Sequence, residues 1–144
     1  MTTYSFDGSE PVPAHRHPYG GGWVADTAKV GEGVYVGPEA TVFGNAKVSE
    51  KAVISVKASV FGDAKVSGRA IISENALVYG NATIDGNATV CGHAGVYGHA
   101  DIDENARVYG NAMVYGRATI TENAEVSGYA KVSGNAMVYE NATV

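Results

Sequence analysis

The sequence has little cysteine, little proline and little positive charge, and these shortages limit what kind of protein it can be. A single cysteine, Cys91, rules out an internal disulfide and fits a reducing compartment. Three of the four prolines lie before residue 20, so the rest of the chain contains few breaks. No apolar run is long enough to span a membrane. A net charge of −5 gives no basic surface of the kind that binds nucleic acid.

What the sequence does contain is a six-residue repeat that runs from Val24 to Val144 without a slip. Every sixth residue in this range is Val or Ile. From position 28 onward, the residue two places before each of these Val or Ile residues is Ala, except at Val34. Turn residues, most often Gly-Asn, stand between these positions, so the unit reads Ala-x-Val-x-Gly-Asn. Unbroken self-similarity of this kind predicts a solenoid.

The unit has the pattern of a short strand followed by a corner. Ala and Val project to one side of the strand, and the two x residues project to the other. Val and Ile suit a pleated, half-buried surface. Gly and Asn both tolerate positive φ, so we expect both to turn the chain at the corner. A period of six fits no helix.

Three such units complete one triangular coil, and outward side chains sort by type at the spacing of one coil. The chain therefore predicts an all-β, triangular parallel β-helix over residues 23–144, with about 18 residues per coil and roughly 6–7 coils. Residues 1–22 are expected to form an irregular N-terminal cap. The sorted columns are Phe43, Phe61, Tyr79, Tyr97 and Tyr115; Lys29, Lys47 and Lys65; and Glu104, Glu122 and Glu140, with Glu32 and Glu50 further along the last.

This repeat resembles the hexapeptide-repeat (transferase hexapeptide) superfamily. The Gly-Asn-Ala-x-Val units, together with Gly-Gly-Trp-Val at residues 21–24, resemble an acyltransferase-like subgroup found in bacteria and phages. The resemblance implies a left-handed parallel β-helix. It also implies an acyl-CoA-dependent enzyme with a histidine base between subunits, often beside a loop thrown out from the helix. Here the register never breaks, so no such loop is expected, and His93 and His99 at two different corners are the only catalytic candidates.

One predicted face carries the aromatic column and is expected to be an interface between copies of the chain. Two alternatives stay open for this face: a ladder that only stabilises the fold, and a platform for a ligand such as a carbohydrate. The expected interface residues are Phe43, Phe61, Leu77, Tyr79, Tyr97, Met113 and Tyr115.

A second face is polar, with lysines in its first half and Asp85, Asp101 and Asp103 in its second. Stacked like charges repel one another, so we expect this face to be solvated. Two weaker ligand-binding sites are considered: the lysine column for an anion, and His15 with His17 in the cap. We expect no metal and no cofactor.

We therefore predict a non-catalytic β-helical scaffold or binding protein that forms a homo-oligomer, side by side through the aromatic face. End-to-end contact at the C-terminus is a further expectation, because the chain ends within a repeat. The alternatives are an acyltransferase-like enzyme with a site between subunits, and a small-ligand binding or sequestering protein. Neither nucleic acid nor membrane is expected as a partner. The segment 1–20 lacks the basic and apolar stretches of a signal peptide, so the expected location is cytoplasmic.

Overall fold

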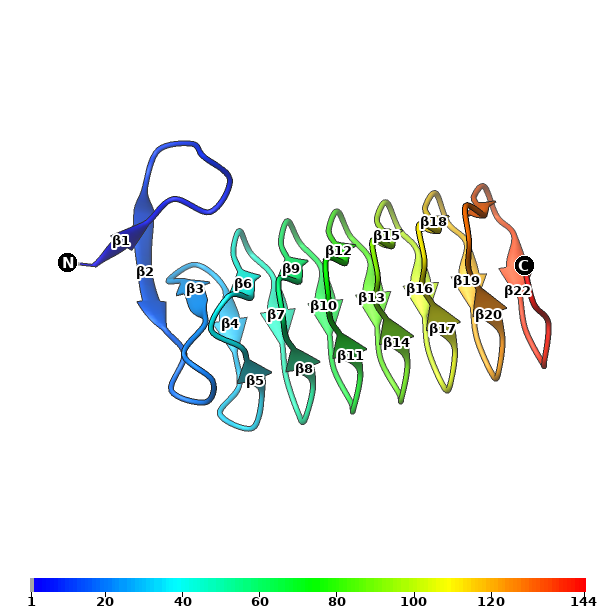
Figure 1. The fold of residues 1–144 in the computed structure, drawn as a ribbon, viewed down its shortest axis with the longest axis horizontal. Helices are drawn as coiled ribbons and strands as arrows, with labels where there is room; N and C mark the ends of the chain where they lie inside the picture. Colours follow the sequence, from blue (N-terminus) through cyan, green and yellow to red (C-terminus); the bar gives the residue numbers. More distant parts are fainter. Residues whose placement is uncertain (1) are drawn as a thin grey trace.

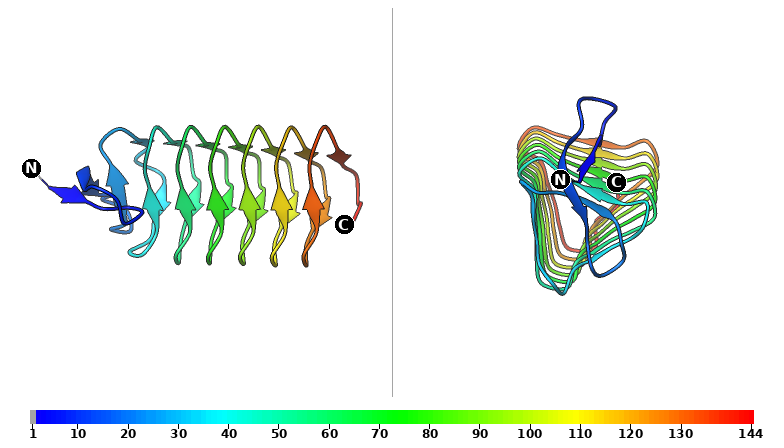
Figure 2. Two further views of the ribbon diagram at one scale, coloured as in Figure 1. Left: turned by 90° about the horizontal axis from the view of Figure 1, so that it is seen from above. Right: turned by 90° about the vertical axis from the view of Figure 1, so that its left-hand side faces the viewer.

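A computed structural model describes residues 2–144, and over this range the chain forms a parallel β-solenoid with a hairpin at its N-terminal end (Figure 1). The coils follow one another along a single long axis. Seen along this axis, they superimpose on a triangular outline (Figure 2). The described residues contain strands, turns and no helix. It follows that this part of the chain has no helix that could cross a membrane.

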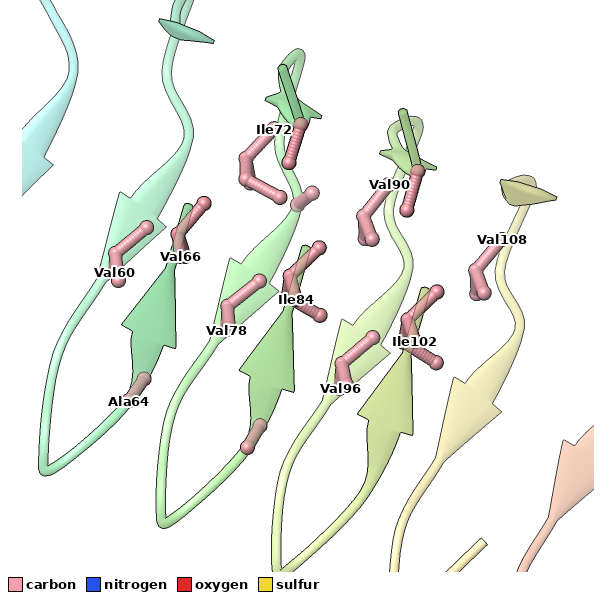
Figure 3. Packing of buried hydrophobic residues seen from close by; sticks show 14 of the residues in the cluster. Val60, Ala64, Val66, Ile72, Val78, Ile84, Val90, Val96, Ile102 and Val108 are labelled. Atoms are coloured by element: carbon pink, nitrogen blue, oxygen red, sulfur yellow. The ribbon is translucent and has the colours of Figure 1, made fainter. Parts of the chain in front are cut away.

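The strands form where the sequence places Ala-x-Val, and they direct Ala and Val into the prism. Val60, Val78 and Val96 have no exposed surface, and the alanines two places before them are equally buried. Figure 3 shows these valines converging on the axis with isoleucines from the other sides of the triangle. The buried residues form one cluster that runs from Val24 to Val138. Each fully buried Val or Ile contributes about 1.5–3 kcal/mol of hydrophobic stabilisation.

The strands belong to three sheets, one for each side of the triangle, and within the solenoid every strand pairs in parallel with the strand one coil away. The nine-stranded sheet contains β1 (Thr3–Tyr4), β2 (Val12–Arg16), β3 (Trp23–Ala25), β6 (Thr41–Val42), β9 (Ser59–Val60), β12 (Leu77–Val78), β15 (Gly95–Val96), β18 (Met113–Val114) and β21 (Lys131–Val132). The seven-stranded sheet contains β4 (Lys29–Val30), β7 (Lys47–Val48), β10 (Lys65–Val66), β13 (Thr83–Ile84), β16 (Asp101–Ile102), β19 (Thr119–Ile120) and β22 (Met137–Val138). The six-stranded sheet contains β5 (Tyr35–Val36), β8 (Val53–Ile54), β11 (Ile71–Ile72), β14 (Thr89–Val90), β17 (Arg107–Val108) and β20 (Glu125–Val126).

The pairing register confirms that one coil spans three repeats. Lys65 lies opposite Lys47 on one side and opposite Thr83 on the other. The Tyr79 backbone N–H donates to the Val96 carbonyl at 3.0 Å, which is one coil further along the axis. Hydrogen bonds of this kind pair the backbone groups of each coil with the next, as buried strands require. The left-handed sense of the coil stays a prediction.

Each regular corner places one residue in the left-handed region, and that residue is the first of the corner pair. Gly98, for example, has φ of 68°, and a Cβ on it would lie 2.9 Å from the Gly116 backbone nitrogen. The second corner residue does not take positive φ, since no Asn of the described chain has it. One edge of the prism carries glycine at its first corner position in six successive coils: Gly44, Gly62, Gly80, Gly98, Gly116 and Gly134. The other edges place some non-glycine residues in the same conformation: Glu50, Val56, Glu74, Glu104, Glu122 and Glu140.

The N-terminal segment closes the first coil with antiparallel pairing. β1 pairs with β2, and β2 pairs with β3, so that Ala14 lies opposite Ala25 and Arg16 lies opposite Trp23. The nine-stranded sheet therefore continues beyond the solenoid into the hairpin (Figure 1). Pairing of this kind satisfies the backbone groups that a bare first strand would leave open.

Candidate functional site

The aromatic column of the nine-stranded sheet is a continuous stack of rings. Phe43, Phe61 and Tyr79 stack with centroids 4.7 and 4.9 Å apart and interplanar angles of 5° and 3°. Tyr97 continues the stack at 4.9 Å, and Tyr115 follows it at 5.0 Å. These spacings match the distance between neighbouring strands, about 4.8 Å. The ring spacing is thus set by the backbone, and each ring pair adds about 0.5–1.5 kcal/mol beyond its buried area.

The second outward column of this sheet is also uncharged. It contains Thr41, Ser59, Leu77, Gly95 and Met113, one residue from each coil. Leu77 is 42% exposed, and the Thr41 and Ser59 hydroxyls hydrogen-bond at 2.9 Å. Between Thr41 and Tyr115 no charged side chain stands on the sheet. We call this surface, made of the two columns, the aromatic face.

Its uncharged character is local, since the other two sides of the prism carry charge. The lysine column lies on the seven-stranded sheet, and Arg107 and Glu125 lie opposite each other on the six-stranded sheet. Within the aromatic face, burial raises the pKa of the Tyr97 phenol, with smaller contributions from Tyr79 and Tyr115. The Tyr97 ring therefore remains neutral throughout the physiological pH range.

The cap lengthens the aromatic column, which the sequence analysis did not predict. Phe6 stacks on Phe43 with centroids 4.8 Å apart, and Tyr4 stacks on Trp23 at 4.7 Å. The Arg16 guanidinium carbon lies 4.6 Å from the centroid of the Trp23 ring. Tyr4 and Phe6 are two residues apart, the same spacing that separates the two outward columns of each later coil. This two-residue spacing was the signal in the sequence that could have identified the pair. The loop that follows them hides how Tyr4 and Phe6 align with the two columns.

The polar seven-stranded sheet brings together the residues that sequence reasoning assigned to it. Lys29, Lys47 and Lys65 pair in register on successive strands. Further along the same sheet, carboxylate oxygens of Asp85, Asp101 and Asp103 lie within 4.8 Å of one another. A divalent cation prefers oxygen ligands of this kind, although exposed acidic groups are common without an ion.

Two aspartates of this acidic cluster have raised pKa values. Burial raises the pKa of Asp85, and the charges of Asp103 and Glu50 add to the effect. Burial also raises the pKa of Asp101, with further contributions from Asp103 and Asp85. One carboxylate oxygen of Asp103 is buried and has no hydrogen-bond partner within residues 2–144. The cluster is therefore electrostatically unfavourable as it stands.

His93 and His99 lie at separate corners, whereas His15 and His17 line one hollow of about 470 Å³ in the cap, together with Glu32. His93 and His99 are exposed corner residues, and their backbone N–H groups donate to Gly110 and Gly116 at 2.7 Å. Neither has positive φ. In the cap, the His15 ring nitrogen Nδ1 lies 2.7 Å from an Asp26 carboxylate oxygen, and both side chains are half exposed. His17 is buried and its Nε2 lies 2.8 Å from the Val34 carbonyl oxygen, so it ties the cap to the first coil.

Cys91 lies on the six-stranded side, beside a hollow of about 300 Å³ that Thr89, Arg107 and Tyr109 also line. Burial raises the pKa of the Cys91 thiol, and the Glu74 charge adds to this, while Arg107 opposes it. A raised pKa lowers the thiolate fraction, and the thiolate is the reactive form. The arrangement is typical of an unreactive cysteine.

The fold and these surfaces define a class, the parallel β-solenoid repeat proteins. Within that class, the family model described as the YdcK beta solenoid repeat matches residues 76–92, 106–116 and 130–144. The matched segments cover less than half of the chain, and they lie in its regular coils. No curated protein and no solved structure shows significant similarity to the chain. The match supports a β-solenoid repeat protein and leaves membership of the acyltransferase superfamily a prediction.

Proposed function

We propose that the protein is a non-catalytic scaffold that self-associates side by side, with the aromatic face of one copy against that of another. The observation that carries the proposal is the stack of rings from Phe43 to Tyr115 on a stretch of the nine-stranded sheet that bears no charged side chain. The centres of protein interfaces are depleted of charged residues and enriched in aromatic residues and Met. The aromatic face has both properties.

The glycine edge supports the same assignment. Each ring of the column precedes a glycine of that edge, as Tyr79 precedes Gly80 and Tyr97 precedes Gly98. A glycine carries no side chain, so the residue directly after each ring adds no bulk beside it; the second corner residues, among them Asp63 and Arg117, are exposed. A second flat face can therefore approach the rings from the side of the glycines more closely than it could if each ring were followed by a long side chain.

The size of the face predicts weak association. Five coils at about 4.8 Å span about 24 Å, and three residues of strand are about 10 Å wide, so the flat area is about 240 Å². Side chains that project from the face enlarge this area, but the area that one copy can bury stays well below the roughly 800 Å² per partner of a standard interface. We therefore expect a concentration-dependent dimer and not an obligate one. End-to-end contact stays a separate prediction.

Sedimentation equilibrium over a range of protein concentrations tests the proposal. The weight-average mass should rise above 14.9 kDa as concentration increases. Replacing Tyr79 and Tyr97 by Lys should keep the mass at the monomer value, because two desolvated ammonium groups would face two others across the interface.

The matched control places the same charges on another side of the prism. Ser55 and Ser73 follow buried isoleucines on the six-stranded sheet, as Tyr79 follows Val78 on the aromatic face. The double variant Ser55→Lys and Ser73→Lys should associate like the unmodified protein. A monomer at every concentration, or equal loss of association in both variants, contradicts the proposal. Acyl-CoA turnover that His93→Ala or His99→Ala abolishes would favour the enzyme instead.

A further inference from the structure

A hollow beneath the loop that joins β1 to β2 is not explained by the proposed function. It has a volume of about 440 Å³, which is within the range of small-molecule sites. The loop arches away from the first coil at the N-terminal end of the prism (Figure 1). Its walls come from the cap and from the solenoid. The cap contributes the loop and β2, and the solenoid contributes the end of β3 and the corner after β6.

The hollow is lined mainly by apolar groups. Phe6 and Phe43, which stack on each other, form part of the wall, and Val12, Pro13 and Ala25 complete it. Val12 is 41% exposed, although it is a β-branched apolar residue in a strand. An apolar hollow of this size would shelter the hydrocarbon part of a ligand from water.

Every charged side chain that lines the hollow is a carboxylate: Asp7, Glu10 and Asp26. The Ser9 side-chain and backbone hydrogen bonds lower the pKa of Asp7, so this group is ionised at neutral pH. The Asp26 carboxylate is held by the His15 ring. No hydrogen bond or ion pair within residues 2–144 engages the Glu10 carboxylate. The nearby Arg16 is directed onto Trp23 and does not line the hollow.

We infer that this hollow binds a small organic cation, namely a primary amine on an aromatic or branched aliphatic stem. The stem lies against Phe6, Val12 and Phe43, and the ammonium group lies among the carboxylates, with Glu10 as its principal partner. An anion of the same size meets three negative charges and is excluded. The hollow shares Phe43 with the aromatic face, but Val12, Glu10 and Asp26 lie outside that face, so variants at these residues test binding separately from self-association.

A set of three ligands with one phenyl ring and similar length tests the inference. Phenethylamine, phenethyl alcohol and 3-phenylpropionate differ mainly in charge, and amide chemical shifts of the ¹⁵N-labelled protein report where each binds. The amine should shift the amides of Phe6, Glu10 and Gly44 in a saturable way, and added salt should weaken its binding. The alcohol should bind more weakly, and the carboxylate should not bind.

Two variants and a control locate the binding. Glu10→Gln should raise the amine's dissociation constant about two- to fivefold, the range of an exposed ion pair. Val12→Trp should abolish binding by filling the hollow, and the amide spectrum shows whether it remains folded. Glu32→Gln, an equal charge change on the far side of the cap, should have no effect. Equal binding of amine and alcohol, an unchanged constant in Glu10→Gln, or the absence of saturable shifts would overturn the inference.

Discussion

Val56 occupies the first position of a corner with φ of 55° and is 53% exposed. A β-branched residue in the left-handed region costs about 1–2 kcal/mol, whereas glycine adopts it freely but gains about 0.5–1 kcal/mol of chain entropy on unfolding. Gly92, Gly110 and Gly128 are glycines at the first corner position on the same edge, and Glu74 is the other non-glycine residue there with positive φ. Val56 is therefore a residue-scale strain in an otherwise regular structure.

We predict that Val56→Gly raises the free energy of unfolding by about 0.5–1 kcal/mol, the difference between those two effects. Urea unfolding followed by circular dichroism measures the change. Lys57→Gly is the matched control, because Lys57 stands at the second corner position and has no positive φ. It should lower stability, since it adds only unfolded-chain entropy. A Val56→Gly protein less stable than its parent would contradict this account.

At the scale of the element, the carboxylates of the acidic cluster repel one another at strands β13 and β16. The raised pKa values of Asp85 and Asp101 mean that the folded chain holds these protons more tightly than the unfolded chain does. The free energy of unfolding must then fall as pH rises from about 3.8 through the raised native pKa values. At neutral pH the penalty is present in full.

Asp103→Asn should relieve part of this penalty, because burial is the main cause of the raised pKa of Asp85 and Asp101 and the Asp103 charge adds to it. We predict a gain of about 0.2–1 kcal/mol at pH 7, the range for like charges on adjacent strands. The gain should shrink toward pH 3, and it should also shrink in high salt. Thermal unfolding at the two pH values measures it. Asp63→Asn, at an exposed corner, is the control; an equal gain there would point to net charge alone.

At the scale of the whole molecule, the regular coils followed from the sequence because every repeat carries the same information. Buried Val or Ile, a small residue two places before it, and a corner pair recur in each coil, so an ambiguity in one is resolved by the next. The aromatic column could be predicted for the same reason. Its members Tyr79 and Tyr97 differ by one coil length and must lie one above the other.

The cap could not be predicted in this way, because it occurs once. The pairing of β2 with β3 depends on which residues of two non-repeating segments meet, and three prolines interrupt the pattern there. The stacking of Phe6 on Phe43 and the hollow beneath the loop depend on that pairing. At the corners, sequence identified the turn but not which of its two residues takes positive φ.

Deletion of whole repeats tests the geometry of the molecule. Removing residues 82–99, one full coil, should leave a folded prism in which Tyr79 stacks on Tyr115. Removing only residues 88–93 keeps the buried pattern but turns the following chain by one side, which sets Asp103 beside Tyr79. We predict that the shorter deletion divides the ring stack between two sides of the prism, whereas the full-coil deletion keeps one column. Nuclear Overhauser contacts between the Tyr79 and Tyr115 rings measure this; their absence in the full-coil deletion would contradict the geometry.

The ring spacings of 4.7–5.0 Å are the pitch of the backbone itself. The backbone therefore sets the distance between outward positions in successive coils, whichever side chains occupy those positions. Outward residues can be exchanged one coil at a time while the interior stays the same. A chain of this design can acquire a new recognition surface by substitution alone, with no change to its frame.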